Sequence, residues 1–212
     1  MKNENIILAS SSPRRIEMME APGINPIIIK PDCSETLPAN IGMQDAVMFL
    51  SLKKALNVEA KLLSESCCRA LQNSGKRKCG ISDEPPYIIA ADTIVYKDGI
   101  IGKPHDADDA LQILKKLRNS SHFVATGIAI IQTGRPKRKV FCEVTEVFFK
   151  NYSDAMLAEY VKTDEPYDKA GGYAVQGTFG NYIERINGDI NNVIGFPWDR
   201  IAREFAMLKD RK

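Results

Sequence analysis

The stretch Ile6-Ile7-Leu8-Ala9-Ser10-Ser11-Ser12-Pro13-Arg14-Arg15 decides the fold. Its first four residues form a short apolar run that is typical of a buried strand, and the serines that follow end the strand. Ser12 is a suitable N-cap, and Pro13 suits the first helical turn, where its missing N–H costs nothing. The stretch therefore predicts a strand, a tight turn and a helix.

The rest of the chain predicts further strands and helices in irregular alternation. We expect strands over 27–30, 87–91, 123–132 and 139–149, and helices over 45–59, 107–117, 153–162 and from Asp199 onward. The last two strands should form a half-exposed hairpin joined at Gly134-Arg135-Pro136. This alternation favours an α/β fold with a mixed sheet over a repeat or a helix bundle.

Residues 61–86 depart from this pattern. The segment is polar, lacks a clear period and holds three of the five cysteines. We interpret it as a surface insertion in a single domain that spans residues 1–212. An odd number of cysteines without CxxC spacing, beside only two histidines, indicates neither a disulfide framework nor a zinc site.

Charge and hydropathy limit the function classes. The 29 basic and 27 acidic residues give a net charge of +2, which is too balanced for the electrostatic surface of a nucleic-acid binder. No apolar run approaches the roughly 20 residues that cross a bilayer, and the first residues do not form a signal peptide. We expect a cytoplasmic protein that binds neither nucleic acid nor membrane.

The serine-rich turn predicts a phosphate site. Free backbone N–H groups at the start of a helix bind anions, and Arg14 and Arg15 stand in the first turn. A serine-capped surface helix with solvated arginines is the alternative. Two cations oppose the helix dipole unless an anion binds, which favours the phosphate site.

Two further motifs carry ionisable groups. Ala90-Ala91-Asp92-Thr93 places a carboxylate at the end of an apolar strand, where it can hold a metal, draw a proton from water or only cap a turn. Gly102-Lys103-Pro104 fixes one lysine between two residues that constrain the backbone, although an exposed loop lysine is the simpler interpretation.

The segment 164–177, Asp-Glu-Pro-Tyr-Asp-Lys-Ala-Gly-Gly-Tyr-Ala-Val-Gln-Gly, is a strong candidate for a loop site. Its glycines allow close backbone approach to a ligand, and Gln176 can read the edge of a base. Neither a Walker loop nor a GxGxxG helix start is present, which argues against a kinase, a GTPase or a dinucleotide oxidoreductase.

The order and spacing of the motifs along nearly the whole chain resemble the Maf family of nucleotide pyrophosphatases. The motifs are LASSSPRR, ADT, GKP, ATG at 125–127, EVTEVFF at 143–149, EPYDKAGGYAVQG and NGDINNVIGFP. The resemblance implies an elongated, two-lobed, inosine-triphosphatase-like fold around a central cleft. It also implies a homodimer and a divalent cation, Mg²⁺ or Mn²⁺, that assists hydrolysis of a nucleoside triphosphate to the monophosphate and pyrophosphate.

The resemblance also implies roles for single residues. Six side chains match phosphate-binding positions: Ser10, Arg14, Arg15, Lys54, Lys103 and Lys169. Asp92 matches the proton acceptor, and Glu35 and Asp92 match metal ligands, so Asp92 is base, ligand or both. Arg14, Thr93 and Gln176 match the selective positions of the subgroup that acts on dTTP and UTP.

Two other functions remain open from the sequence. An inosine or xanthosine triphosphate pyrophosphatase shares the reaction but needs a pocket that reads purines. A non-catalytic nucleotide sensor that regulates cell division would keep the cleft for binding alone.

Overall fold

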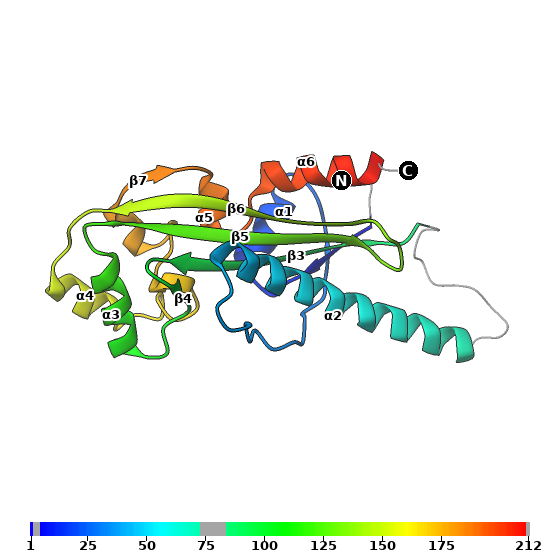
Figure 1. The fold of residues 1–212 in the computed structure, drawn as a ribbon, viewed down its shortest axis with the longest axis horizontal. Helices are drawn as coiled ribbons and strands as arrows, with labels where there is room; N and C mark the ends of the chain where they lie inside the picture. Colours follow the sequence, from blue (N-terminus) through cyan, green and yellow to red (C-terminus); the bar gives the residue numbers. More distant parts are fainter. Residues whose placement is uncertain (2–4, 73–83, 211–212) are drawn as a thin grey trace.

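The structure, a computed structural model that describes residues 1, 5–72 and 84–210, is built on one seven-stranded mixed sheet (Figure 1). The strands are β1 Ile6–Ala9, β2 Ile27–Ile28, β3 Tyr87–Tyr96, β4 Ile100–Ile101, β5 Ser121–Gln132, β6 Arg138–Phe149 and β7 Ile183–Asn187. Their order is β2-β1-β3-β5-β6-β7, with β4 paired to β3. The pairs that β1 makes are parallel and the others are antiparallel.

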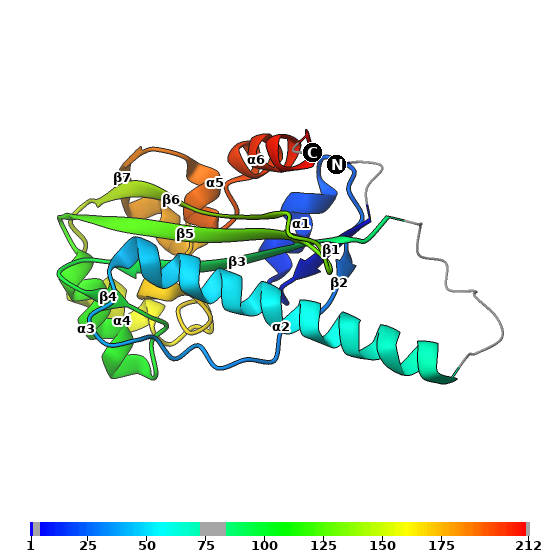
Figure 2. The same ribbon diagram turned by 45° about the vertical axis from the view of Figure 1, so that its right-hand side comes forward.

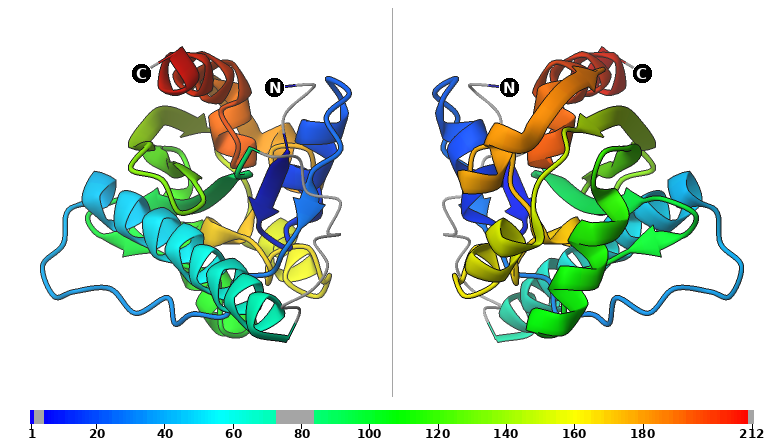
Figure 3. Two further views of the ribbon diagram at one scale, coloured as in Figure 1. Left: turned by 90° about the vertical axis from the view of Figure 1, so that its right-hand side faces the viewer. Right: turned by 90° about the vertical axis from the view of Figure 1, so that its left-hand side faces the viewer.

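Helices cover both faces of this sheet. They are α1 Pro13–Glu20, α2 Met43–Gln72, α3 Ala107–Leu117, α4 Asp154–Tyr160, α5 Ile190–Ile194 and α6 Trp198–Asp210, with short 3₁₀ turns η1 Ala170–Gly172 and η2 Thr178–Tyr182. Figure 2 shows α2 crossing one face of the sheet, while α1, α5 and α6 lie on the other. The end-on views of Figure 3 show the sheet between these two layers. Within the described ranges, no helix is long and apolar enough to cross a membrane.

The short strand β1 explains why its sequence is apolar throughout. Ile6 and Leu8 belong to the core beneath α1 and α6. Ile7 and Ala9 belong to the core beneath α2. Successive side chains of a strand point to opposite faces, so a strand covered on both faces needs apolar residues at every position.

A separate core fills the other end of the sheet. It joins the far ends of β3, β5 and β6 to α3, α4 and the segment around η1 and η2, and it is rich in aromatic rings such as Phe149, Tyr152 and Phe179. Figure 1 shows α3 and α4 grouped at this end, away from α1 and α6. The molecule is therefore an elongated α/β protein with hydrophobic cores on both faces of one sheet and at its far end, which confirms the predicted fold class.

Several element predictions are confirmed and others need correction. The hairpin and α3 are found nearly as predicted, and α4 begins after Ser153, whose side chain accepts from Met156 N. The hairpin is not half-exposed throughout, because helices cover both faces of β5 and bury nearly all of it. Ser12 precedes α1, but its side chain makes no capping hydrogen bond.

The segment predicted as an insertion is partly helical. Helix α2 continues to Gln72, well past Glu59, where we expected it to end. Residues 73–83 lie outside the described residues. Figures 1 and 2 show the C-terminal part of α2 extending beyond the sheet.

Gly127 allows α2 to lie directly against the sheet. A Cβ at this position would stand 2.2 Å from the carbonyl oxygen of Val47 in α2 and 2.7 Å from the nitrogen of Met48. Gly127 pairs with Asp92 across β3 and β5. The close approach therefore fixes α2 on β5, directly beside Asp92 of the neighbouring strand β3, and this explains the glycine of the ATG motif.

We predict that Gly127→Ala destabilises the protein by about 3 kcal/mol, at the upper end for overpacking, because the new methyl group meets backbone that cannot rotate away. Urea unfolding would measure the loss. Gly102→Ala is the matched control, since a Cβ there meets nothing within 4 Å and should change stability by less than about 0.5 kcal/mol. Equal effects of the two substitutions would contradict the role given to Gly127.

Candidate active site

A cavity of about 660 Å³ lies between the start of α1, helix α2, strand β3 and the segment around η1. Five cationic side chains and three carboxylates line it: Arg14, Arg15, Lys54, Lys103 and Lys169 with Glu35, Asp92 and Asp168. Apolar side chains line it as well, among them Leu37, Leu50, Val95, Val175, Val193 and Ile194. The wall thus offers both positive charge for an anion and apolar surface for a ring.

Lys54 lies between two carboxylates. Its Nζ is 2.5 Å from Asp92 Oδ1 and 2.7 Å from Glu35 Oε1. The side chains of Lys54 and Asp92 are only 12% and 10% exposed, whereas that of Glu35 is 61% exposed. Burial raises the pKa of Asp92 and the ammonium opposes that shift. The hydrogen bond from Lys54 lowers the pKa of Glu35.

The position of Asp92 differs from the prediction in one respect. The strand does not end at Ala91, because β3 continues to Tyr96 along its long antiparallel partner β5. The parallel neighbour β1 does end there, since its last residue Ala9 pairs with Ala90. Asp92 thus stands just beyond the carboxyl end of β1, and the turn that starts α1 lies at the same edge.

Arg15 is committed to protein contacts on both sides of Asp92. It donates from Nη1 to the carbonyl of Ala91 at 2.8 Å and from Nη2 to Thr93 Oγ1 at 3.0 Å, and from Nε to the carbonyl of Gly195 at 2.9 Å. Burial lowers the pKa of its guanidinium, which nevertheless stays charged at physiological pH. Three of its five N–H groups are used in this way, so two remain for a ligand.

The other cations divide into two kinds. Lys169 donates to the carbonyl of Glu165 at 2.7 Å and to Asp168, so its own loop holds it. Arg14 and Lys103 line the cavity, and their side chains have no hydrogen-bond or ion-pair partner within the described part of the chain. These two side chains are the ones most available to an anion.

The loop 164–177 is fixed by contacts that the sequence did not reveal. Glu165 accepts from the Tyr160 hydroxyl at 3.2 Å and from Thr178 N at 3.1 Å. A Cβ at Gly177 would lie 1.9 Å from a Glu165 oxygen, so a side chain there would displace the Glu165 carboxylate from these contacts. Gly171, at φ 74°, donates from its N–H to the carbonyl of Gly102 and joins the loop to the turn of Lys103.

Two predicted site residues do not face the cavity. Ser10 is buried, and its Oγ accepts from Ser12 N at 3.1 Å, so it stabilises the turn before α1. Gln176 is exposed and lies outside the cavity wall, where its neighbour Val175 is found instead. Thr93 does line the cavity, but its hydroxyl is engaged by Arg15 and Thr126.

A buried histidine supports the cavity wall. Tyr173 lines the cavity, and its hydroxyl lies 2.6 Å from His122 Nε2. Burial lowers the pKa of His122 to about 3, with a smaller contribution from Lys97, so this imidazole is neutral at physiological pH. Tyr173 belongs to the predicted loop site, whereas His122 was not predicted, because a histidine inside a strand carries no sequence signal.

The carboxylates fit a divalent cation. Oxygens of Glu35 and Asp92 converge on one point, which the Lys54 ammonium now fills, and hard oxygen donors are what Mg²⁺ prefers. In the described residues no three acidic, histidine or cysteine side chains gather. A cation held here would therefore need further oxygens from a ligand or water, as is usual for Mg²⁺ bound with phosphates.

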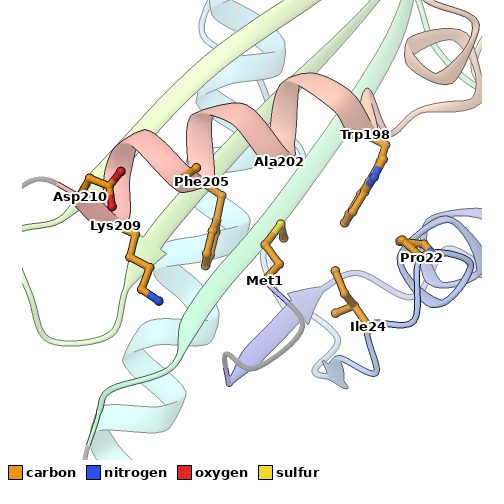
Figure 4. Close-up of a pocket in the computed structure, with 9 residues that line it drawn as sticks. Met1, Pro22, Ile24, Trp198, Ala202, Phe205, Lys209 and Asp210 are labelled. Carbon is orange, nitrogen blue, oxygen red and sulfur yellow. The ribbon is translucent and has the colours of Figure 1, made fainter.

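A second cavity, of about 310 Å³, has a different character. Figure 4 shows Trp198 and Phe205 of α6 opposite Met1 and Ile24, with Lys209 at one side. Its lining is mostly apolar, with Lys209 and Asp210 as the charged residues at its rim. Catalysis on a phosphate needs cations and a base, so the larger cavity is the candidate active site.

Comparisons with known proteins show which family this chain is similar to. The family described as Maf-like protein matches residues 5–208. A dTTP/UTP pyrophosphatase of Clostridium tetani is 40% identical over 208 residues, which cover 97% of each chain. A protein of the same name from Acetivibrio thermocellus is 38% identical over 205 residues, covering 97% of this chain and 94% of that one. Among solved structures, the Ham1 protein of Staphylococcus aureus aligns with a TM-score of 0.46 and 13% identity, covering 98% of this chain and all of that one.

We predict that His122 makes the protein sensitive to acid. The unfolded chain binds a proton at this imidazole below pH 6.5 and the native state does so only near pH 3. Stability should therefore fall as pH drops between these values, by up to about 1.4 kcal/mol per pH unit. His122→Gln, which keeps a polar partner for Tyr173, should flatten the pH dependence of urea unfolding between pH 6.5 and 4.5.

His105→Gln is the control for this measurement, because it removes the exposed histidine, the other of the two in the sequence. It should leave the slope as in the wild type. A slope unchanged in His122→Gln would show that the acid sensitivity has another source.

Proposed function

This chain belongs to the Maf family, and we propose that it hydrolyses dTTP and UTP to the monophosphate and pyrophosphate. The single observation that carries the proposal is the cavity in which cations, a buried carboxylate and apolar surface meet. A triphosphate group needs the cations, the reaction needs a base, and a nucleoside needs apolar surface. Two relatives that match this chain over 97% of its length have the name dTTP/UTP pyrophosphatase.

Charge counting supports a polyphosphate substrate. The five cations and three carboxylates of the cavity wall leave an excess of two positive charges, which equals the net charge of the whole chain. The remaining 24 basic and 24 acidic residues of the chain therefore sum to zero. A triphosphate transition state spreads negative charge over its non-bridging oxygens, and fixed cations stabilise it there.

A divalent metal, Mg²⁺ or Mn²⁺, completes this proposal. Glu35 and Asp92 would hold it, with phosphate oxygens and water as the remaining ligands. Such an ion supplies charge neutralisation at the phosphates and lowers the pKa of bound water. Because Lys54 now lies between the two carboxylates, its ammonium would move to the phosphates when the ion binds.

The side chains of this chain then act as follows. Arg14, Lys103 and Lys169 hold the phosphates, and Asp92 accepts a proton from the attacking water. The water oxygen forms a bond to the α-phosphorus while the bond from that phosphorus to the oxygen bridging to the β-phosphorus breaks, and pyrophosphate leaves. Burial that raises the pKa of Asp92 makes it a stronger base than an exposed aspartate.

The pyrimidine preference rests on the resemblance at Arg14, Thr93 and Gln176. Gln176 is exposed and outside the cavity wall, so its part in base recognition stays a prediction. The homodimer and the cytoplasmic location likewise stay predictions.

We predict that dTTP and UTP are the best substrates in a panel of canonical and modified triphosphates assayed for pyrophosphate release with Mg²⁺ and with Mn²⁺. CTP and the purine triphosphates should be at least about tenfold poorer in kcat/KM, which corresponds to roughly 1.4 kcal/mol of lost polar contact. ITP or XTP as the best substrate would favour the purine pyrophosphatase. Tight nucleotide binding without turnover would favour a non-catalytic sensor.

We further predict that Asp92→Asn lowers kcat by roughly 10²-fold or more, because an amide nitrogen neither accepts a proton nor binds a hard cation. Asp98→Asn is the control: Asp98 follows the same strand, is exposed, and has a φ of 53° that asparagine tolerates. Circular dichroism would check that both variants fold. Activity of Asp92→Asn within about threefold of the wild type would remove Asp92 from the role of base.

A further inference from the structure

A buried set of hydrogen bonds ties α5 to the strands beneath it. Asn192 is fully buried, and its Nδ2 donates to the carbonyl of Val124 at 2.9 Å and to Thr145 Oγ1 at 3.0 Å. The backbone carbonyl of Asn192 accepts from Thr126 Oγ1 at 3.0 Å. Thr126 and Thr145 are also fully buried, so each of these groups needs its partner.

The protons of this set can be assigned. A carbonyl oxygen only accepts, so the single proton of the Thr126 hydroxyl goes to Asn192. The contact of 2.9 Å between Thr93 and Thr126 must then be donated by Thr93. Thr93 in turn accepts from Arg15 Nη2. The bonds therefore run in one direction, from Arg15 through Thr93 and Thr126 to the carbonyl of Asn192.

This chain closes into a ring. Arg15 also donates to the carbonyl of Gly195, and the N–H of Gly195 donates to the carbonyl of Asn192 at 3.0 Å. The ring joins α1, β3, β5 and the C-terminal end of α5. Arg15, one member of the ring, also contacts the residues on either side of Asp92, since it donates to the Ala91 carbonyl and to the Thr93 hydroxyl.

We propose that Thr126 is a positioning residue. Its hydroxyl accepts from Thr93 and donates to the Asn192 carbonyl in α5, and in this way it holds Thr93 and Arg15 beside Asp92. This inference rests on the proposed function, in which Asp92 acts on the substrate. Thr126 itself does not line the cavity, so it acts only through Thr93. Loss of its hydroxyl leaves Thr93 without an acceptor and frees Arg15 to turn away from the strand.

Thr145 provides a matched control for the test. Both threonines are fully buried, both lie in the central strands, and each hydroxyl donates to a carbonyl at the α5 segment, that of Asn192 or that of Asp189. Among the described residues, Thr145 makes no hydrogen bond to Thr93 or Arg15 and instead bonds to Asp189 and Asn192. Thr126→Val and Thr145→Val should therefore cost similar stability, while only the first disturbs the ring.

The test measures kcat, KM and melting temperature for the two variants. We expect Thr126→Val to lower kcat about tenfold or more, since small misplacements of catalytic groups have effects of this size, with KM within about threefold. Thr145→Val should keep kcat within about twofold at a similar melting temperature, and Thr126→Ser should restore most of the lost kcat. Equal activity of the two valine variants would overturn the inference.

Crystal structures of the same variants separate this inference from the proposed function. Whatever substrate the wild type accepts, Arg15 should lose its bond to Thr93 in Thr126→Val and keep it in Thr145→Val. An unchanged Arg15 and Thr93 in Thr126→Val would overturn the inference. Should valine prevent folding, Thr126→Ala and Thr145→Ala form the substitute pair with the same expected difference.

Discussion

The contact between the α2 backbone and Gly127 is the constraint on which the site depends. Because no side chain separates them, the helix lies directly on the strand that pairs with β3 at Asp92. Two turns further along α2, the Lys54 ammonium reaches the Asp92 carboxylate at 2.5 Å. A nearly buried carboxylate without such a partner would be costly. By letting α2 lie close to the sheet, Gly127 thus allows Lys54 of that helix to form its ion pair with Asp92.

The two adjacent arginines of α1 illustrate how similar sequence signals acquire different roles. Arg15 turns into the molecule and donates to groups on β3 and after α5, whereas Arg14 faces the cavity without a protein partner in the described ranges. A guanidinium can either bind protein groups or bind an anion, since it has five N–H donors in a fixed planar arrangement. The cations of the site therefore divide between those that shape the cavity and those left to bind an anion.

Local patterns explain which predictions were right. The strand and helix at the start, the β5–β6 hairpin and α3 follow from short-range periodicity and turn residues, so the sequence alone predicted them. The convergence of the Lys54, Asp92, Lys103 and Lys169 side chains followed from the resemblance in motif order. The exposed position of Gln176, the buried pair of His122 and Tyr173, and the ring through Thr126 depend on contacts between distant segments, which no local pattern encodes.

Unequal strand lengths explain why the site lies where it does. Strand β1 stops at its pairing with Ala90, and β4 begins to pair with β3 only at Val95. Between these points no strand of the described residues pairs with this edge of β3, and Asp92 and Thr93 lie in that interval. Unpaired backbone groups in a protein interior need other partners, and the carbonyl of Ala91 finds one in Arg15 Nη1. The gap in the sheet thus leaves space for a ligand, and its unpaired backbone also provides the carbonyl that binds Arg15 at the border of that space.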